Sequence, residues 1–191
     1  ETIGDIGDFD LVKQAAVDAR PDIVFHLAAQ PLVRRSYDAP LETATTNILG
    51  TAHVLEALRA NKNDCPVVVV TSDKCYENDG TPRAFTEDDP LGGDDPYSAS
   101  KAAVRAWGEA LRGAVAGDGI EVSVICPGYI ETPMTATNSY PMPLLMTAAR
   151  AARIIRRGLA RNQGRIAFPL PLYLVMWLIG AAPPGITDPL M

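Results

Sequence analysis

The chain has few residues of the kinds that build disulfide frameworks or metal centres. Its 191 residues include three scattered cysteines, Cys65, Cys75 and Cys126, with no Cys-x-x-Cys pair, and only two histidines. An odd number of dispersed cysteines favours neither a disulfide scaffold nor a zinc site, and it fits a reducing compartment. We therefore expect a cytoplasmic protein that holds no metal.

Positive charge and long apolar runs are also scarce. The 17 lysines and arginines are outnumbered by 23 acidic residues, for a net charge of −6, which argues against a general nucleic-acid binder. The longest apolar stretch, FPLPLYLVMWLIGAA at 168–182, contains two prolines and is shorter than the ~20 residues of a bilayer span. We interpret it as a core or dimer-contact segment; contact of Tyr173 and Trp177 with a membrane surface is the alternative.

What the chain does have is a regular alternation of helix and strand patterns. Apolar positions recur with helical spacing in four segments, whereas short continuous apolar runs indicate strands buried on both faces. The predicted helices cover 9–20, 40–61, 97–116 and 147–161, and the predicted strands cover 23–29, 66–71, 120–126 and 165–168. This order is typical of an α/β domain with a parallel sheet between two layers of helices, and the length fits one domain.

The segment YSASK at 97–101 is the strongest indication of chemistry. A tyrosine and a lysine four positions apart lie on one face of a helix, where the ammonium lowers the pKa of the phenol. Ser72 follows a buried strand and could hydrogen-bond the same substrate oxygen. Taken alone, a Tyr-x-x-x-Lys pattern arises often by chance in amphipathic helices.

The surroundings of that motif strengthen it. In a parallel α/β sheet, ligands bind beyond the carboxyl ends of the strands. The predicted strands end at Ala28–Ala29, at Ser72 and at Pro127–Gly128, and the helix of Tyr97 begins on the same side. We therefore expect four segments that are distant in sequence to converge there.

The same motifs carry a family resemblance. The chain resembles the short-chain dehydrogenase/reductase superfamily, whose Rossmann-like, doubly wound parallel sheet it is expected to share. Residues 1–101 resemble the CDP-glucose 4,6-dehydratases of the extended branch through HLAAQPLVRRSY (26–37), TNILGT (46–51), TSDKCYEN (71–78) and EDDPLGGDDPYSASK (87–101). Residues 102–191 are similar to short, single-domain dehydrogenases through ICPGYIETPMT (125–135) and NSYPMPLLM (138–146). The chain thus resembles a hybrid of two branches within one partial Rossmann-type domain.

The dehydratase resemblance implies a set of catalytic roles. Tyr97 would take the proton of the sugar 4-hydroxyl as hydride leaves for NAD, with Lys101 lowering its pKa and Ser72 orienting the hydroxyl. Asp73 would protonate the departing 6-hydroxyl, and Lys74 would accept the carbon-5 proton.

It also implies binding residues. Asp5 and Ile6 would contact the adenine side of the cofactor, and Ala28 and Ala29 would line it. A loop containing Arg34, Arg35 and Ser36 would lie beside a nucleotide-sugar substrate.

The resemblance to short dehydrogenases implies a simpler reaction with one hydride transfer. Asn47, Ser72, Tyr97 and Lys101 would form the catalytic set, with Asn47 holding a water. Pro127, Gly128 and Thr132 would grip the nicotinamide, and the substrate would be an alcohol or ketone.

Both implied activities need a dinucleotide, yet the chain contains no Gly-x-Gly-x-x-Gly near its start. We expect the phosphate-binding turn and the first strands to be missing, with reduced cofactor affinity. An inactive fragment or scaffold is therefore a third hypothesis, and NAD is expected, with NADP open. By resemblance we also expect a homodimer that pairs helices 40–61 and 97–116.

Other polar residues have plainer interpretations. His26 lies in a predicted buried strand and is expected to be a hydrogen-bonded core residue. The five arginines at 150, 153, 156, 157 and 161 are expected to form a solvated helix face.

Overall fold

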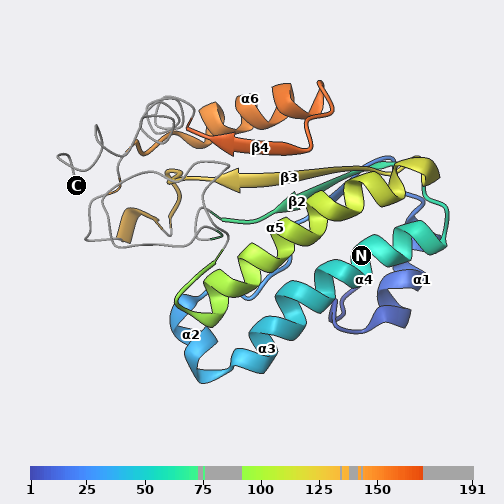
Figure 1. Cartoon of the computed structure of the whole chain (residues 1–191), viewed down its shortest axis with the longest axis horizontal. Helices are drawn as coiled ribbons and strands as arrows, with labels where there is room; N and C mark the ends of the chain where they lie inside the picture. The colour runs from blue at the N-terminus through green and yellow to red at the C-terminus, as the bar shows by residue number, and fades with distance from the viewer. Residues whose placement is uncertain (73–74, 76–91, 134, 138–141, 143, 170–191) are drawn as a thin grey trace, which may run out of the picture.

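The computed structural model of the chain describes residues 1–72, 75, 92–133, 135–137, 142 and 144–169. Four parallel strands form one sheet in the order β1-β2-β3-β4 (Figure 1). They are β1 (Val24–His26), β2 (Pro66–Val70), β3 (Glu121–Pro127) and β4 (Arg165–Phe168). The predicted α/β class and the parallel sheet are confirmed.

Helices cover both faces of this sheet, which confirms the doubly wound arrangement (Figure 1). On one face lie α4 (Gly50–Ala60) and α5 (Pro96–Val115), with α1 (Phe9–Ala19) packed along α4; on the other lies α6 (Ala148–Leu159). The short elements are α2 (Val33–Asp38), α3 (Pro40–Ala44), η1 (Thr45–Leu49), η3 (Ala116–Asp118) and η4 (Thr135–Thr137).

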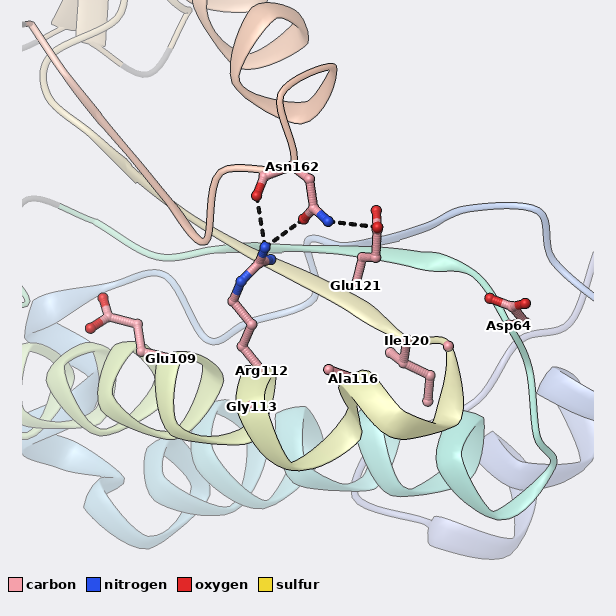
Figure 2. Close-up of a pocket in the computed structure, with 9 residues that line it drawn as sticks. Asp64, Glu109, Arg112, Gly113, Ala116, Ile120, Glu121 and Asn162 are labelled. Atoms are coloured by element: carbon pink, nitrogen blue, oxygen red, sulfur yellow. Dashed lines mark hydrogen bonds between the residues drawn. The ribbon is translucent and has the colours of Figure 1, made fainter.

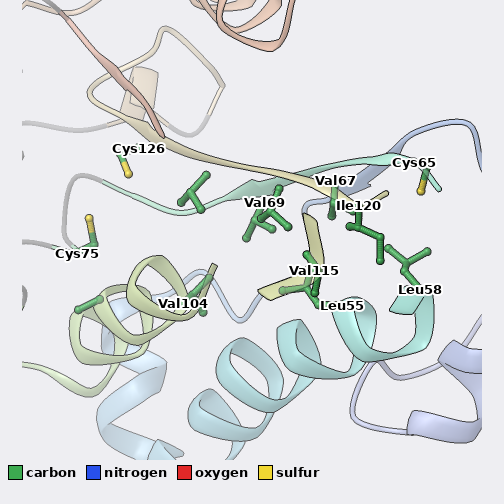
Figure 3. Packing of buried hydrophobic residues seen from close by; sticks show 13 residues of the cluster. Leu55, Leu58, Cys65, Val67, Val69, Cys75, Val104, Val115, Ile120 and Cys126 are labelled. Carbon is green, nitrogen blue, oxygen red and sulfur yellow. The ribbon is translucent and has the colours of Figure 1, made fainter. Parts of the chain in front are cut away.

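The alternation of side chains along β2 explains how two cores form on one strand. Val67 and Val69 belong to the cluster under α4 and α5 (Figure 3), whereas Val68 belongs to a second cluster with Ala151 of α6. Successive strand residues point to opposite faces, and β-branched side chains pack well on such a surface. The valine run therefore supplies both cores at once.

Capping residues set where three helices begin. Asp8 accepts from Leu11 N at the start of α1, Asp95 accepts from Ser98 N at the start of α5, and Thr147 accepts from Arg150 N at the start of α6. Each side-chain oxygen satisfies a backbone donor that the helix itself leaves open. The cap at Asp95 matters most because it fixes where Tyr97 and Lys101 stand on α5.

Two local predictions needed correction. The segment with Arg34, Arg35 and Ser36 was predicted to be a loop, but it forms helix α2. It was missed because six helical residues provide too short an apolar repeat to detect. The predicted helix 40–61 is helical throughout but divided, since its middle residues, Thr45–Leu49, form a π-helical turn.

Candidate active site

Tyr97 and Lys101 lie together in the first turns of α5, as their spacing predicted. Both side chains are buried, and Lys101 Nζ lies 5.7 Å from the centroid of the Tyr97 ring. The backbone N–H of Tyr97 donates to Ser36 Oγ at 3.1 Å, which ties this turn of α5 to α2. The pair is therefore held from both sides, by the Asp95 cap and by α2.

Burial changes the acid–base behaviour of the lysine. Desolvation lowers the pKa of Lys101 to about 8, and the nearby Cys75 sulfur opposes that shift. A lysine that gains and loses its proton close to neutral pH can take part in proton transfer or tune its neighbour, the Tyr97 phenol. The acid–base role of Tyr97 that the Tyr-x-x-x-Lys spacing indicated stays a prediction.

Ser72 leaves the carboxyl end of β2, which the neighbouring strand holds in place. Thr71 donates both its backbone N–H and its hydroxyl to the carbonyl oxygen of Ile125, each at 2.8 Å. Ser72 is half-buried, and its carbonyl accepts from Cys75 N. The structure thus places Ser72 at the edge where the site was predicted; Asp73 and Lys74 lie outside the described residues.

A buried amide network that the sequence did not reveal supports the tyrosine helix. Asn47 in η1 accepts from Gln30 N at 2.8 Å, and its Nδ2 donates to Gln30 O at 3.3 Å and to Ser100 Oγ at 2.8 Å. Ser100 Oγ in turn donates to Tyr97 O. Both hydrogens of the Asn47 amide bond protein groups, so this side chain joins η1 to α5; the water that Asn47 was predicted to hold stays a prediction.

Gln30 and Ser100 were missed as functional residues, although Gln30 directly follows the predicted Ala28–Ala29 strand end. The Gln30 side chain also bonds Thr43 Oγ1 and both polar groups of Leu32. A buried glutamine at a strand end was the available signal, since buried polar groups need partners.

His26 behaves as predicted, as a hydrogen-bonded core residue. Its Nε2 pairs with Thr51 Oγ1 at 2.8 Å, and the Thr51 hydroxyl donates to Asn47 O. Burial, together with the charge of Lys101, lowers the pKa of His26 to about 4. His26 is therefore neutral at pH 7 and adds no positive charge to the site.

The predicted cofactor residues of the central strands lie at the same edge of the sheet. Ala28 is exposed and Ala29 half-buried just beyond β1, while Pro127 ends β3 and Gly128 follows it. Gly128 N donates to Phe168 O, and a Cβ at this position would come within 3.2 Å of that oxygen. Thr132 is exposed and shares hydrogen bonds with Thr135.

Asp5 and Ile6 lie on the flank formed by η1 and α4. The Asp5 carboxylate accepts from Gly7 N at 2.8 Å, and Ile6 packs against Gly50, where a Cβ would overlap its side chain. Their predicted contact with the adenine stays a prediction.

The three predicted substrate residues have different environments. Arg34 is exposed, whereas Arg35 already pairs with Glu42 at 2.9 Å. Ser36 is fully buried, accepts from Tyr97 N and donates to Val33 O. Ser36 thus joins α2 to the Tyr97 turn of α5, and its predicted contact with the substrate stays a prediction.

A cavity of about 540 Å³ lies at the opposite end of the sheet (Figure 2). Arg112, Glu121 and Asn162 line it, and Arg112 donates to Val122 O and to Asn162. Arg112 follows Tyr97 by some four turns of α5, or roughly 20 Å along the helix axis. We assign no catalytic role to this cavity, because α/β proteins with parallel sheets bind their ligands at the carboxyl ends of the strands.

The described helices include none that is both long and apolar enough to cross a bilayer.

Comparisons with known proteins agree with this geometry. Residues 2–123 match the family model described as GDP-mannose 4,6 dehydratase. The chain is 47% identical over 110 residues to CDP-glucose 4,6-dehydratase from Salmonella typhimurium, covering 58% of this chain and 31% of that protein. It is 39% identical over 82 residues to an uncharacterized oxidoreductase of Myxococcus xanthus, covering 43% of this chain and 32% of that protein.

Among solved structures, dTDP-glucose 4,6-dehydratase from Streptomyces venezuelae, with NAD bound, superposes with a TM-score of 0.65 at 22% identity. The match covers 86% of this chain and 56% of that one. At 22% identity, this similarity shows that the two chains share a fold.

Proposed function

The chain belongs to the GDP-mannose 4,6 dehydratase family, and from this premise we propose that it carries catalytic residues of an NAD-dependent nucleotide-sugar 4,6-dehydratase. The chain spans about a third of the length of the curated relatives named above. The proposed activity is therefore that of a whole protein that contains this Tyr97 site.

The observation that carries the proposal is the buried Tyr97–Lys101 pair at the carboxyl edge of the sheet, next to Ser72. Lys101, with its pKa lowered to about 8 by burial, lies beside the phenol that would remove the proton from the 4-hydroxyl. Ser72 would hydrogen-bond that hydroxyl. Asp73 and Lys74 follow directly in sequence and would serve the elimination of water across carbons 5 and 6.

The described residues fit a flat dinucleotide at this edge. Ala28 and Ala29 have small side chains beyond β1, and Gly128 has none beyond β3. When bound, NAD would accept hydride from carbon 4 of the sugar and later return it to carbon 6. NADP remains a second candidate for the same edge.

We propose CDP-glucose as the substrate because the motifs of residues 1–101 resemble enzymes for this sugar nucleotide and the Salmonella relative bears that name. Arg34 is an exposed cation of α2 that, unlike Arg35, makes no ion pair with a carboxylate among the described residues, and it could reach the substrate phosphates.

A single-step alcohol or ketone oxidoreductase is the second candidate function. The specific observation in its favour is Asn47, whose π-helical turn is bonded to the helix of Tyr97, together with the Myxococcus relative described as an oxidoreductase.

Calorimetric titration with NAD⁺ and NADP⁺, with and without CDP-glucose, followed by an assay for the 4-keto product, tests the proposal. We expect micromolar cofactor binding and product formation. Asp73→Asn should abolish elimination under the dehydratase proposal and leave hydride transfer under the alternative. Absence of binding and of turnover with any substrate would favour the inactive scaffold.

We also propose a homodimer and a cytoplasmic location. Leu41, Leu49 and Trp107 are exposed apolar side chains on α3, η1 and α5, the helices predicted to pair. The three unpaired cysteines suit a reducing compartment. A monomer in light scattering at micromolar concentration would contradict the dimer.

A further inference from the structure

Cys75 and Cys126 come from different segments and meet beside the catalytic edge. Cys126 is in β3, and Cys75 lies just past the end of the neighbouring strand β2. Figure 3 shows the two side chains turned toward the same space. Both side chains belong to the same buried cluster, and each thiol acts on the pKa of the other, raising it for Cys75 and lowering it for Cys126.

The groups around this pair favour a reactive thiolate on Cys126. The Cys75 thiol lowers the pKa of Cys126 by hydrogen bonding, and the Thr71 hydroxyl, which shares its one hydrogen with Ile125 O, lies 3.3 Å from the Cys126 sulfur. Arg105, which is almost completely buried, places Nη1 4.0 Å from the Cys75 sulfur. These hydrogen bonds and the guanidinium lower the pKa of Cys126 despite its burial, and the thiolate is the nucleophilic form of cysteine.

Cys65 provides an internal comparison. It is equally buried, at the amino end of β2, and desolvation raises the pKa of its thiol. The strand β2 separates it from the other two cysteines, and it belongs to the end of the sheet opposite Ser72. Burial alone therefore does not produce the environment of the pair.

We propose that Cys75 and Cys126 form an oxidative modification site, a dithiol that hydrogen peroxide converts into an intramolecular disulfide. The Cys126 thiolate attacks one peroxide oxygen, so that an S–O bond forms, the O–O bond breaks and the second oxygen leaves as water after protonation. The Cys75 thiol, losing its proton, then attacks the Cys126 sulfur, so that the S–S bond forms and the S–O bond breaks, releasing a second water. Two thiols are oxidised and one peroxide is reduced.

The disulfide has a consequence for the neighbouring catalytic residues. Cys75 N bonds Ser72 O, and the Cys75 sulfur acts on the pKa of Lys101. Oxidation would tie Cys75, whose backbone N–H bonds Ser72 O, covalently to β3 beside the catalytic edge. This part of the inference rests on the proposed function.

Trypsin separates the three cysteines, which makes the modification easy to map. Cleavage after lysine and arginine places Cys65 in peptide 63–74, Cys75 in peptide 75–83 and Cys126 in peptide 113–150. The chain is treated with hydrogen peroxide, remaining thiols are alkylated, and the non-reduced digest is analysed by mass spectrometry.

In the wild type we expect peptides 75–83 and 113–150 to be linked in at least tenfold excess over any link to 63–74, and in Cys65→Ser we expect the same 75–83 to 113–150 link to form. The link should be absent from Cys126→Ser, with Cys75→Ser as the replacement if that variant does not fold. Thiols consumed without this link, or equal linkage through Cys65, would overturn the proposal.

Activity gives a separate readout. Formation of the 4-keto product should fall at least tenfold on oxidation and recover with dithiothreitol in Cys65→Ser, but persist in Cys126→Ser. A chain that forms the disulfide without ever turning over substrate would refute the proposed function and leave the modification site established.

Discussion

Asn47 Nδ2 donates a 2.8 Å hydrogen bond to Ser100 Oγ. These residues are 53 positions apart in the chain, and their bond joins the π-helical turn η1 to the helix that carries Tyr97 and Lys101. Ser100 Oγ in turn donates a hydrogen bond to Tyr97 O.

Ser100→Ala should destabilise the protein by about 1–3 kcal/mol, because the buried Asn47 amide loses an acceptor. Cofactor binding or turnover should weaken as well, since η1 is no longer held against α5. Urea unfolding and calorimetry measure the two effects. Ser123→Ala is the matched control: its hydroxyl donates to Gln163 O away from the site, so it should lose stability alone. Equal effects of both variants on binding would contradict the positioning role.

Lys101→Met should stabilise the chain at pH 7 while abolishing activity. The pKa of Lys101 is lowered to about 8 by burial, so between pH 8 and its unfolded value near 10.5 the unfolded chain binds more protons. Stability therefore rises with pH across that window, and at pH 7 the buried charge costs roughly 3 kcal/mol.

Unfolding in urea at pH 7 and pH 10.5 checks this sign. The stability gain of Lys101→Met should shrink at the higher pH, whereas Lys13→Met, at an exposed position of α1, should change little at either. A less stable Lys101→Met protein at pH 7 would show that the ammonium is well compensated.

Glu109→Ala should cost about 3–5 kcal/mol, because Glu109 is the carboxylate partner of the buried Arg105 at 3.0 Å and also bonds Arg165. Burial raises the pKa of Glu109, but its bonds to these two arginines outweigh burial and lower that pKa overall. The stability that ionised Glu109 contributes is therefore lost as the pH falls through the lowered pKa. Glu42→Ala, which breaks the exposed pair with Arg35, is the control and should cost at most about 1 kcal/mol. Similar losses in both variants would contradict a special role for the buried network.

Two glycines of α5 should respond oppositely to alanine. At Gly108 a Cβ would lie 2.7 Å from Val124 Cγ2, whereas at Gly113 it would meet nothing within 4 Å. We expect Gly108→Ala to destabilise by about 1–3 kcal/mol through overpacking against β3 and Gly113→Ala to stabilise by up to about 1 kcal/mol. Thermal unfolding of both variants measures these effects. Stabilisation in both would show that β3 shifts at little cost to accommodate the added methyl group on α5.

Prediction from the sequence succeeded where the local pattern agreed with the tertiary environment. The valine run of β2 could hardly be anything but a buried strand, and the strand 165–168 was placed at its observed bounds. The short helix α2 failed because its six residues carry too little periodicity. The burial of Ser36 could not be predicted either, since it depends on α5, a distant element.

The sequence by itself determined the α/β alternation, the helical spacing that places Tyr97 beside Lys101, and the strand ends that gather at one edge. These follow from interactions within a few residues, which periodicity records. Only the tertiary structure decided that Asn47 bonds Gln30 and Ser100, that burial brings the Lys101 pKa to about 8, and that Cys75 meets Cys126. Such contacts join residues tens of positions apart, and desolvation depends on everything packed around a group, so no local pattern contains them.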